Sequence, residues 1–162
     1  MDRTELLEAL KARQEEVGKD LLMPTKPQKG IESIRRPSLV YNGRLPDETS
    51  STTKAPYTLN CLVSGSFGRD AGQPENDRCV IRTVMCVYNP DGTEGTMALI
   101  NLMERYRISL QKDPILDHTY ELDLKARIQD LVYPDDTAPF YMGEMYTEWI
   151  LPPVEREVQQ WL

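Results

Sequence analysis

The sequence of 162 residues has few of the groups that enzymes and metal sites use. It contains one histidine, His118, and three cysteines without Cys-x-x-Cys spacing, Cys61, Cys79 and Cys86. Neither the phosphate-binding pattern G-x-x-x-x-G-K-[S/T] nor the dinucleotide-binding pattern G-x-G-x-x-G occurs. We therefore expect no catalytic residue, no metal site and no cofactor. Cys61 and Cys86 lie in strand-like runs, where buried free thiols are expected.

Long hydrophobic runs are also missing. Nowhere do about 18 apolar residues follow one another, so no membrane-spanning helix is expected. The start Asp2-Arg3-Thr4-Glu5 is charged and lacks the apolar segment of a signal peptide, which favours a cytoplasmic location. Acidic residues outnumber basic ones by 26 to 19, for a net charge of −7, and this balance disfavours general binding to nucleic acid.

Three groups of polar residues could carry chemistry, but each has a simpler interpretation. His118 lies in a polar connection without a nucleophile in a known motif, which is typical of a surface histidine. The pair Asp135 and Asp136 lacks the further oxygen ligands that a divalent cation needs. Glu144 and Glu148, on one face of a strand, would be roughly 13 Å apart, too far for a coupled acid and base, so we expect both in solvent.

What the sequence does contain is strongly patterned secondary structure. Asp2 and Glu5 form a capping-box pattern that begins a helix over residues 2–22, and Pro24 stops it. This helix has a thin apolar stripe and is expected to dock weakly on its own domain or to await a partner. Prolines and few apolar anchors make residues 23–56 an extended arm, in which residues 38–41 and 44–45 could form a short hairpin around Asn42-Gly43.

Four strands and one main helix are predicted in the rest of the chain. The strands cover residues 57–64, 78–88, 120–126 and 141–151, joined in part by a flexible connection over residues 65–77 and a turn-rich loop at 133–136. Alternation places Tyr57, Leu59, Cys61 and Val63 on one face of the first strand. The main helix follows Asp91-Gly92, with Thr93 or Thr96 as its cap and an apolar stripe made of Leu99, Leu102, Met103, Tyr106 and Leu110.

This order of elements predicts an α+β fold. A mostly antiparallel sheet carries one main helix packed on a face, together with an N-terminal helix and an extended arm. The predicted domains are residues 1–35, an N-terminal helix and linker, and residues 36–162, the α+β domain with its arm at 36–56. Aromatic residues near the end of the chain, of the kind enriched at protein interfaces, suggest contacts with other chains, although Trp149 is expected in the core.

Several of these segments together resemble a known family. They are the arm Arg36-Pro37-Ser38-Leu39-Val40-Tyr41 with Leu45-Pro46, the strand Val84–Tyr88 with Asp91-Gly92, the helical run from Asn101 to Ile108, Tyr133-Pro134-Asp135-Asp136, and the end formed by residues 139–143 and 149–153. Over residues 36–158 the pattern is similar to that of the tail terminator proteins of phages with long, non-contractile tails. These motifs are structural rather than catalytic.

The resemblance implies a structural protein of the virion with an α+β fold. Copies would form a homo-hexameric ring that caps the tail tube, ends its growth and joins tail to head, with the tail tube protein and head–tail connector proteins as partners. DNA would pass through the lumen without specific binding, and the protein would move from the host cytoplasm into the virion. The expected contact residues are Tyr41, Leu45, Tyr141, Tyr146 and Trp161. The alternatives are a head-closure or connector-adaptor protein of the phage neck, or a cytoplasmic enzyme of unrecognised type.

Overall fold

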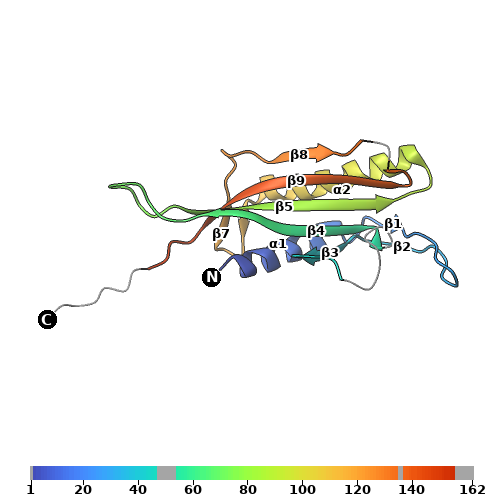
Figure 1. Ribbon diagram of the computed structural model, residues 1–162, viewed down its shortest axis with the longest axis horizontal. Coiled ribbons are helices and arrows are strands. Elements are labelled where there is room, and N and C mark those ends of the chain that lie inside the picture. The colour runs from blue at the N-terminus through green and yellow to red at the C-terminus, as the bar shows by residue number, and fades with distance from the viewer. Residues whose placement is uncertain (1, 47–53, 135–136, 156–162) are drawn as a thin grey trace.

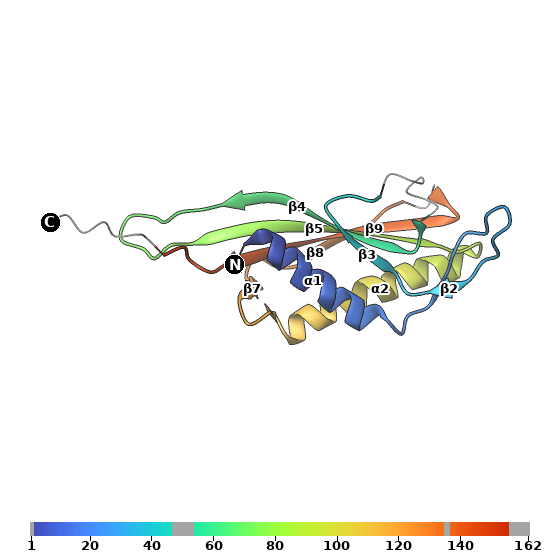
Figure 2. The same ribbon diagram turned by 90° about the horizontal axis from the view of Figure 1, so that it is seen from below.

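The computed structural model describes residues 2–46, 54–134 and 137–155. In this structure two helices lie on one face of a mostly antiparallel sheet, which confirms the predicted α+β class (Figures 1 and 2). The elements are α1 (Arg3–Gly18), β1 (Met23–Pro24), β2 (Arg35–Arg36), β3 (Leu39–Asn42), β4 (Tyr57–Ser66), β5 (Asp77–Tyr88), α2 (Gly92–Lys112), β6 (Ile115–Leu116), β7 (Tyr120–Leu122), β8 (Gln129–Val132) and β9 (Phe140–Leu151).

The central layer is a seven-stranded sheet with the order β3-β4-β5-β9-β7-β6. The strand β8 pairs with β9 beside β7. The β5–β9 pair runs over the full length of both strands, from Asp77 opposite Leu151 to Tyr88 opposite Phe140. The apolar character of both faces of β5 follows from this position between β4 and β9, as predicted for a central strand.

The main helix, α2, lies on the sheet through the predicted stripe. Leu99, Leu102, Met103, Tyr106 and Leu110 are all buried. The cap differs from the prediction, because the Asp91 side chain accepts hydrogen bonds from the backbone N–H groups of Thr93 and Glu94, at 2.9 and 3.1 Å. Asp91 is the residue immediately before the first helical turn, which is the position that a capping carboxylate requires.

The N-terminal helix begins with the predicted capping box at Asp2 and Glu5 and ends at Gly18, four residues earlier than residue 22. It does not dock only weakly, since Leu6 and Leu10 are fully buried in a core shared with Cys79, Ile81 and Trp149 of the sheet. At those positions α1 contributes to the same core as the sheet.

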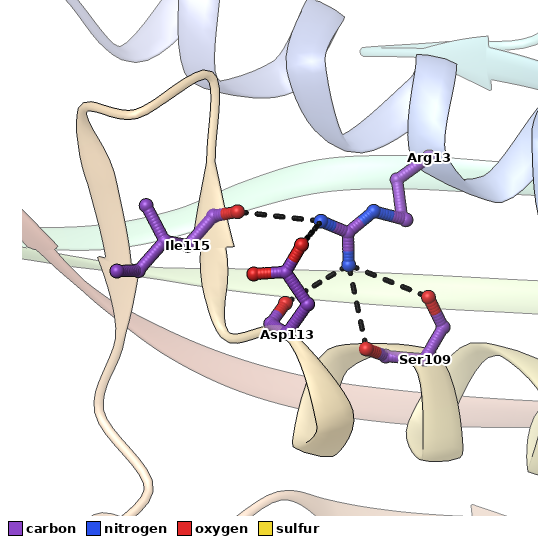
Figure 3. A network of polar contacts seen from close by, with 4 residues as sticks. All are labelled: Arg13, Ser109, Asp113 and Ile115. Carbon is purple, nitrogen blue, oxygen red and sulfur yellow. Dashed lines mark hydrogen bonds and ion pairs between the residues drawn. The ribbon is translucent and has the colours of Figure 1, made fainter.

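Arg13 links α1 to the C-terminal end of α2 (Figure 3). Its guanidinium group donates to the Ser109 carbonyl and hydroxyl, to the Asp113 carbonyl and carboxylate, and to the Ile115 carbonyl. Carbonyl groups in the last turn of a helix have no partner within that helix. Arg13 of α1 therefore donates hydrogen bonds to carbonyl groups at the C-terminal end of α2. Its positive charge also interacts favourably with the negative pole of the helix dipole.

Three strand predictions need correction. The segment at 38–42 does not form a hairpin with residues 44–45, because β3 pairs in parallel with β4, with Leu39 opposite Tyr57. The strand predicted over 120–126 ends at Leu122, and a turn in which Arg127 has a positive φ of 63° leads to β8, which the sequence pattern did not indicate. β1 and β2 form a small hairpin within residues 23–56, which were predicted as an extended arm without this pairing.

The most informative correction concerns β4. Its polar residues Thr58 and Asn60 are fully buried, on the side covered by the helices. Tyr57, Leu59 and Cys61 lie on the opposite face, where a smaller apolar cluster forms. A bulge between Leu62 and Ser64 then interrupts the alternation that was predicted to include Val63.

Candidate self-association surfaces

The sheet face away from the helices, which we call the outer sheet face, is covered by side chains and short segments rather than by a helix. At one end Tyr57 and Cys86 are buried in an apolar cluster. The predicted contact residues Tyr41 and Leu45 meet there, half-buried against that cluster. They anchor the arm to its own domain and leave part of each side chain accessible.

A polar cluster occupies the middle of the outer sheet face. Arg82 donates to the Glu144 carboxylate at 2.6 Å and to the Tyr133 hydroxyl at 2.9 Å, and Tyr133 also donates to Glu144 at 2.9 Å. Glu144 is only 8% exposed, so the prediction of a solvated carboxylate was wrong. The predicted contact residue Tyr146 is half-buried at the side of this cluster, with its hydroxyl 3.4 Å from Glu144.

The charge of Glu144 is retained despite its burial. Removal from water would raise the pKa of this carboxyl, but the hydrogen bonds and charge of Arg82, with those of the tyrosines, hold the pKa below its ordinary value. Glu148 pairs more loosely with Arg78, at 3.9 Å. Arg78 makes its close ion pair with Asp123 instead. The Arg82–Glu144 contact therefore has the arrangement of a structural ion pair.

Tyr141 lies on the other side of the sheet. Its ring is buried beneath the first turn of α2, where a Cβ atom added at Gly95 would come within 2.3 Å of the ring. Gly95 is therefore required for this close approach. A ring held in this way belongs to the interior of the subunit, so the prediction of Tyr141 as an accessible contact residue was wrong. Trp161 lies outside the described residues.

The groups considered for chemistry are dispersed. His118 is exposed in the turn between β6 and β7, and Asp135 and Asp136 lie outside the described residues. Burial raises the pKa of Cys79 to about 11 and that of Cys86 to about 12, so these thiols stay protonated and are poor nucleophiles near neutral pH. Among residues 2–46, 54–134 and 137–155, no three His, Cys, Asp or Glu side chains gather in a way that could hold a metal ion.

One uncovered margin of the sheet is the β8 edge, residues 129–132 on the side away from β9. Leu131 pairs opposite Glu144, and Tyr133 N–H donates to the Met142 carbonyl. Alternation in an antiparallel pair then directs the backbone groups of Asp130 and Val132 away from β9. No described strand pairs with that side. The side chains of Leu131 and Val132 are 55% and 42% exposed.

The opposite margin is the β4 edge, residues 62–66 on the side away from β5. β3 covers β4 only as far as Asn60, where the Gly43 N–H donates to the Asn60 carbonyl. Beyond that point β4 pairs, among the described strands, with β5 alone. Leu62 and Val63 are exposed here, and residues 62–66 carry no charge that would discourage another strand.

The fold and these margins define a class: an α+β protein whose sheet is open on both sides. No family model matches the chain, and a search of curated proteins found no match either. In the part of the chain that the structure describes, no helix is long and apolar enough to cross a membrane.

Sequence reasoning did not identify either edge. β8 was not predicted because Gln129-Asp130-Leu131-Val132 has no period-two alternation. Residues 62–64 of the β4 edge were predicted as strand and residues 65–66 as a connection, but a strand prediction does not say which side of a strand stays unpaired. The run Leu62-Val63 could have indicated an exposed apolar edge, because it continues the strand without a charged residue.

Proposed function

We propose that this protein is a structural component of a phage virion that forms a homo-hexameric ring. The ring caps the tail tube, ends tube growth and joins tail to head. Its partners are further copies of itself, the tail tube protein and head–tail connector proteins. DNA passes through its lumen without specific binding. The protein acts first in the host cytoplasm and then within the neck of the particle.

The observation that carries this proposal is the pair of uncovered edges on opposite sides of one sheet. Exposed edges invite pairing with another chain, and natural monomers usually block them with charges, proline or covering segments. Because the β8 edge and the β4 edge are different surfaces, a contact between them is heterologous, and such contacts close into rings when the rotation per subunit permits. The resemblance over residues 36–158 supplies the tail context.

A ring built in this way explains how growth could end without an enzyme. Lateral contacts bury Leu131, Val132, Leu62 and Val63, which a single copy leaves exposed. One ring face then binds the last ring of the tube, and the other face lacks the contacts that a further tube ring needs. The net charge of −7 per copy limits adhesion of DNA to the ring.

The test combines solution mass with electron microscopy. Light scattering of the purified protein is expected to give a hexamer, and added rings are expected to cap purified tail tubes. Leu131→Lys and Val63→Lys, one on each edge, should each give folded monomers, because a lysine on an edge opposes pairing. Ile108→Lys is the matched control, since Ile108 is 40% exposed on α2, outside both edges.

Other outcomes would redirect the proposal. Rings that bind isolated portal complexes and leave tubes uncapped would identify a head-closure or connector-adaptor protein of the neck. A wild-type protein that remains monomeric with tubes present would contradict the ring. Substrate turnover that depends on His118 would favour the enzyme alternative, and a His118→Ala variant with intact assembly would oppose it.

A further inference from the structure

A groove lies between the first half of α2 and residues 21–24, and we call it the α2 groove. Three of the side chains that line it are large, apolar and exposed: Leu22 at 49%, Met97 at 60% and Ile100 at 38%. Met23 lines the groove as well, although it belongs to the core and is only 1% exposed. Apolar side chains gathered in a hollow are typical of a surface that another segment covers.

The sequence after β9 contains a segment with the residue pattern of such an occupant. We call residues 154–162 the amphipathic segment. Its apolar residues follow the spacing i, i+4, i+7 and i+8, which places them on one face of a helix; they are Val154, Val158, Trp161 and Leu162. The intervening residues are Glu, Arg and Gln, which favour helices. Val154, the last apolar residue that the structure describes, is 71% exposed. Apolar anchors at this spacing are those that a helix uses when it lies in an apolar groove.

The amphipathic segment starts far from the α2 groove of its own copy. β9 ends at Leu151, opposite Asp77, whereas α2 follows Tyr88 at the other end of the β5–β9 pair (Figures 1 and 2). The 12 residues of β9 span about 36 Å, at roughly 3.3 Å per residue. Because Ile100 lies about two turns into α2, or about 11 Å back along the sheet, roughly 25 Å remain to the groove. A helix over residues 154–162 is only about 13 Å long, so it cannot lie along the groove of its own copy.

We propose that the amphipathic segment of one copy docks as a helix in the α2 groove of a second copy. Two observations identify this occupant: the segment carries apolar anchors at helical spacing, and its own groove is out of its reach. Every copy has both parts, so each can give a segment and receive one. Docking buries the exposed parts of Leu22, Met97 and Ile100 against the apolar face of the segment.

This contact differs from the lateral edges of the proposed ring and does not depend on that ring. It uses α2 and residues 21–24, which lie outside both the β8 edge and the β4 edge. The two docked surfaces are different, so the contact is heterologous. Its complementarity is apolar, and burial of apolar surface is not weakened by the screening of charges. The association is therefore expected to persist at high ionic strength.

Tryptophan fluorescence follows this contact in the full chain. The sequence has two tryptophans, and Trp149 is fully buried, so quenching by acrylamide reports mainly on Trp161. A Trp161→Phe variant measures the contribution of Trp149. The protein is studied in the background of Leu131→Lys, which separates this contact from ring formation. We expect quenching to fall as the protein concentration rises, and to do so also at about 1 M salt, where charges are screened beyond about 3 Å.

A pair of complementary variants tests which surfaces meet. Met97→Glu places a charge in the α2 groove, and Trp161→Ser removes the largest anchor of the amphipathic segment. Each should weaken association in sedimentation velocity about tenfold or more. An equimolar mixture should recover association, because one variant supplies an intact groove and the other an intact segment. Leu124→Glu is the matched control and should leave association unchanged, since Leu124 is 44% exposed and lies outside the groove.

Circular dichroism establishes that each variant is folded. Protection of Trp161 that does not depend on protein concentration would place the segment on its own copy and overturn the proposal. So would protection that survives Met97→Glu, or a mixture that does not associate. Capping of tail tubes that requires Met97, with quenching of Trp161 unchanged, would assign the groove to the tube protein instead. If the segment docks as proposed while the wild-type protein forms no ring, the proposed function alone fails.

Discussion

The two helices lie on the same sheet face but are held there by different forces. α2 sits on Met85, Val87 and Met145, and its own stripe completes an apolar core. α1 contributes Leu6 and Leu10 at one end, but further along it meets buried polar groups, with Gln14 and Asn60 exchanging two amide hydrogen bonds of 3.1 and 2.7 Å. Burial of apolar surface holds α2 against the sheet, whereas the hydrogen bonds between Gln14 and Asn60 specify the position of α1 on the sheet.

Further buried polar groups lie beside the Gln14–Asn60 pair between the sheet and the helices. The Thr83 hydroxyl donates to Asn60 at 2.7 Å, and the Thr58, Ser38 and Tyr106 hydroxyls form a second chain at 2.7 and 2.9 Å. Burial raises the pKa of Tyr106 to about 12, so its hydroxyl stays neutral and available as a donor. Among the described residues no buried side-chain polar atom lacks a partner. A fully satisfied network of this kind favours one docking position of a helix over its neighbours.

The largest effect is expected where α2 meets the sheet. Leu102→Ala, at a fully buried position, should lower the free energy of unfolding by about 2–5 kcal/mol, because it removes packed methyl groups and leaves a cavity. Urea denaturation followed by fluorescence measures the change. Ile100→Ala on the exposed side of α2 is the control, and an equal loss there would contradict the assignment of the buried face.

The polar contacts of α1 provide the second test. Asn60→Ala should cost about 1–3 kcal/mol, since it leaves the Gln14 amide and the Thr83 hydroxyl buried without this partner. In a double-mutant cycle, Asn60→Leu combined with Gln14→Leu should recover much of the loss, because both partners of the bond become apolar. Strictly additive losses in the cycle would mean that the two amides are not coupled.

Loss of the α2 cap should come next in size. Asp91→Ala removes the acceptor for two backbone N–H groups and is expected to cost about 1 kcal/mol, the usual value for a capping residue. Thr93→Ala should change stability far less, because Thr93 contributes its backbone rather than its side chain. Thermal unfolding measures the stability of both variants. A larger loss for Thr93→Ala than for Asp91→Ala would favour Thr93 as the cap, as the sequence pattern predicted.

The smallest effect is expected on the outer sheet face. The folded-state pKa of Glu144 is lowered below 4.5, so its interaction with Arg82 is fully present above that pH and is lost as pH falls through the folded pKa. Glu144→Gln should therefore reduce the loss of stability on acidification from about pH 5 to 3, by less than about 1 kcal/mol, because solvent reaches the Arg82 side chain, which is 36% exposed, and screens the pair. Urea denaturation at several pH values measures the free energy of unfolding of both proteins. The same pH dependence in wild type and Glu144→Gln would argue against the Arg82–Glu144 ion pair.

Sequence patterns predicted the apolar faces better than the polar contacts. The period of Leu99, Leu102 and Tyr106 identified the buried side of α2 correctly, because a helical backbone repeats at fixed intervals. Asp91 could have been recognised as a cap from its position before a helical run. The buried state of Asn60 could not, since a polar residue in an alternating strand is ordinarily assigned to solvent.

The candidate surfaces depended still more on long-range arrangement. Tyr41 and Leu45 were predicted as contact residues and lie together beside the outer-face cluster, whereas Tyr141, drawn from the same aromatic pattern, is enclosed beneath Gly95. Nothing local distinguishes these environments. The identity of an edge strand is likewise a property of the whole sheet, so β8 became an edge only through its register with β9.

The sequence by itself determined the α+β class, the position of the main helix and the apolar face of α2, because these follow from periodicity over a few turns of chain. Tertiary structure alone decided which polar groups became internal. Gln14 and Asn60 are 46 positions apart, and Arg82 and Glu144 are 62 apart. A buried polar group is stable only when its partner is present, and only the folded chain brings partners so distant in sequence within hydrogen-bonding range.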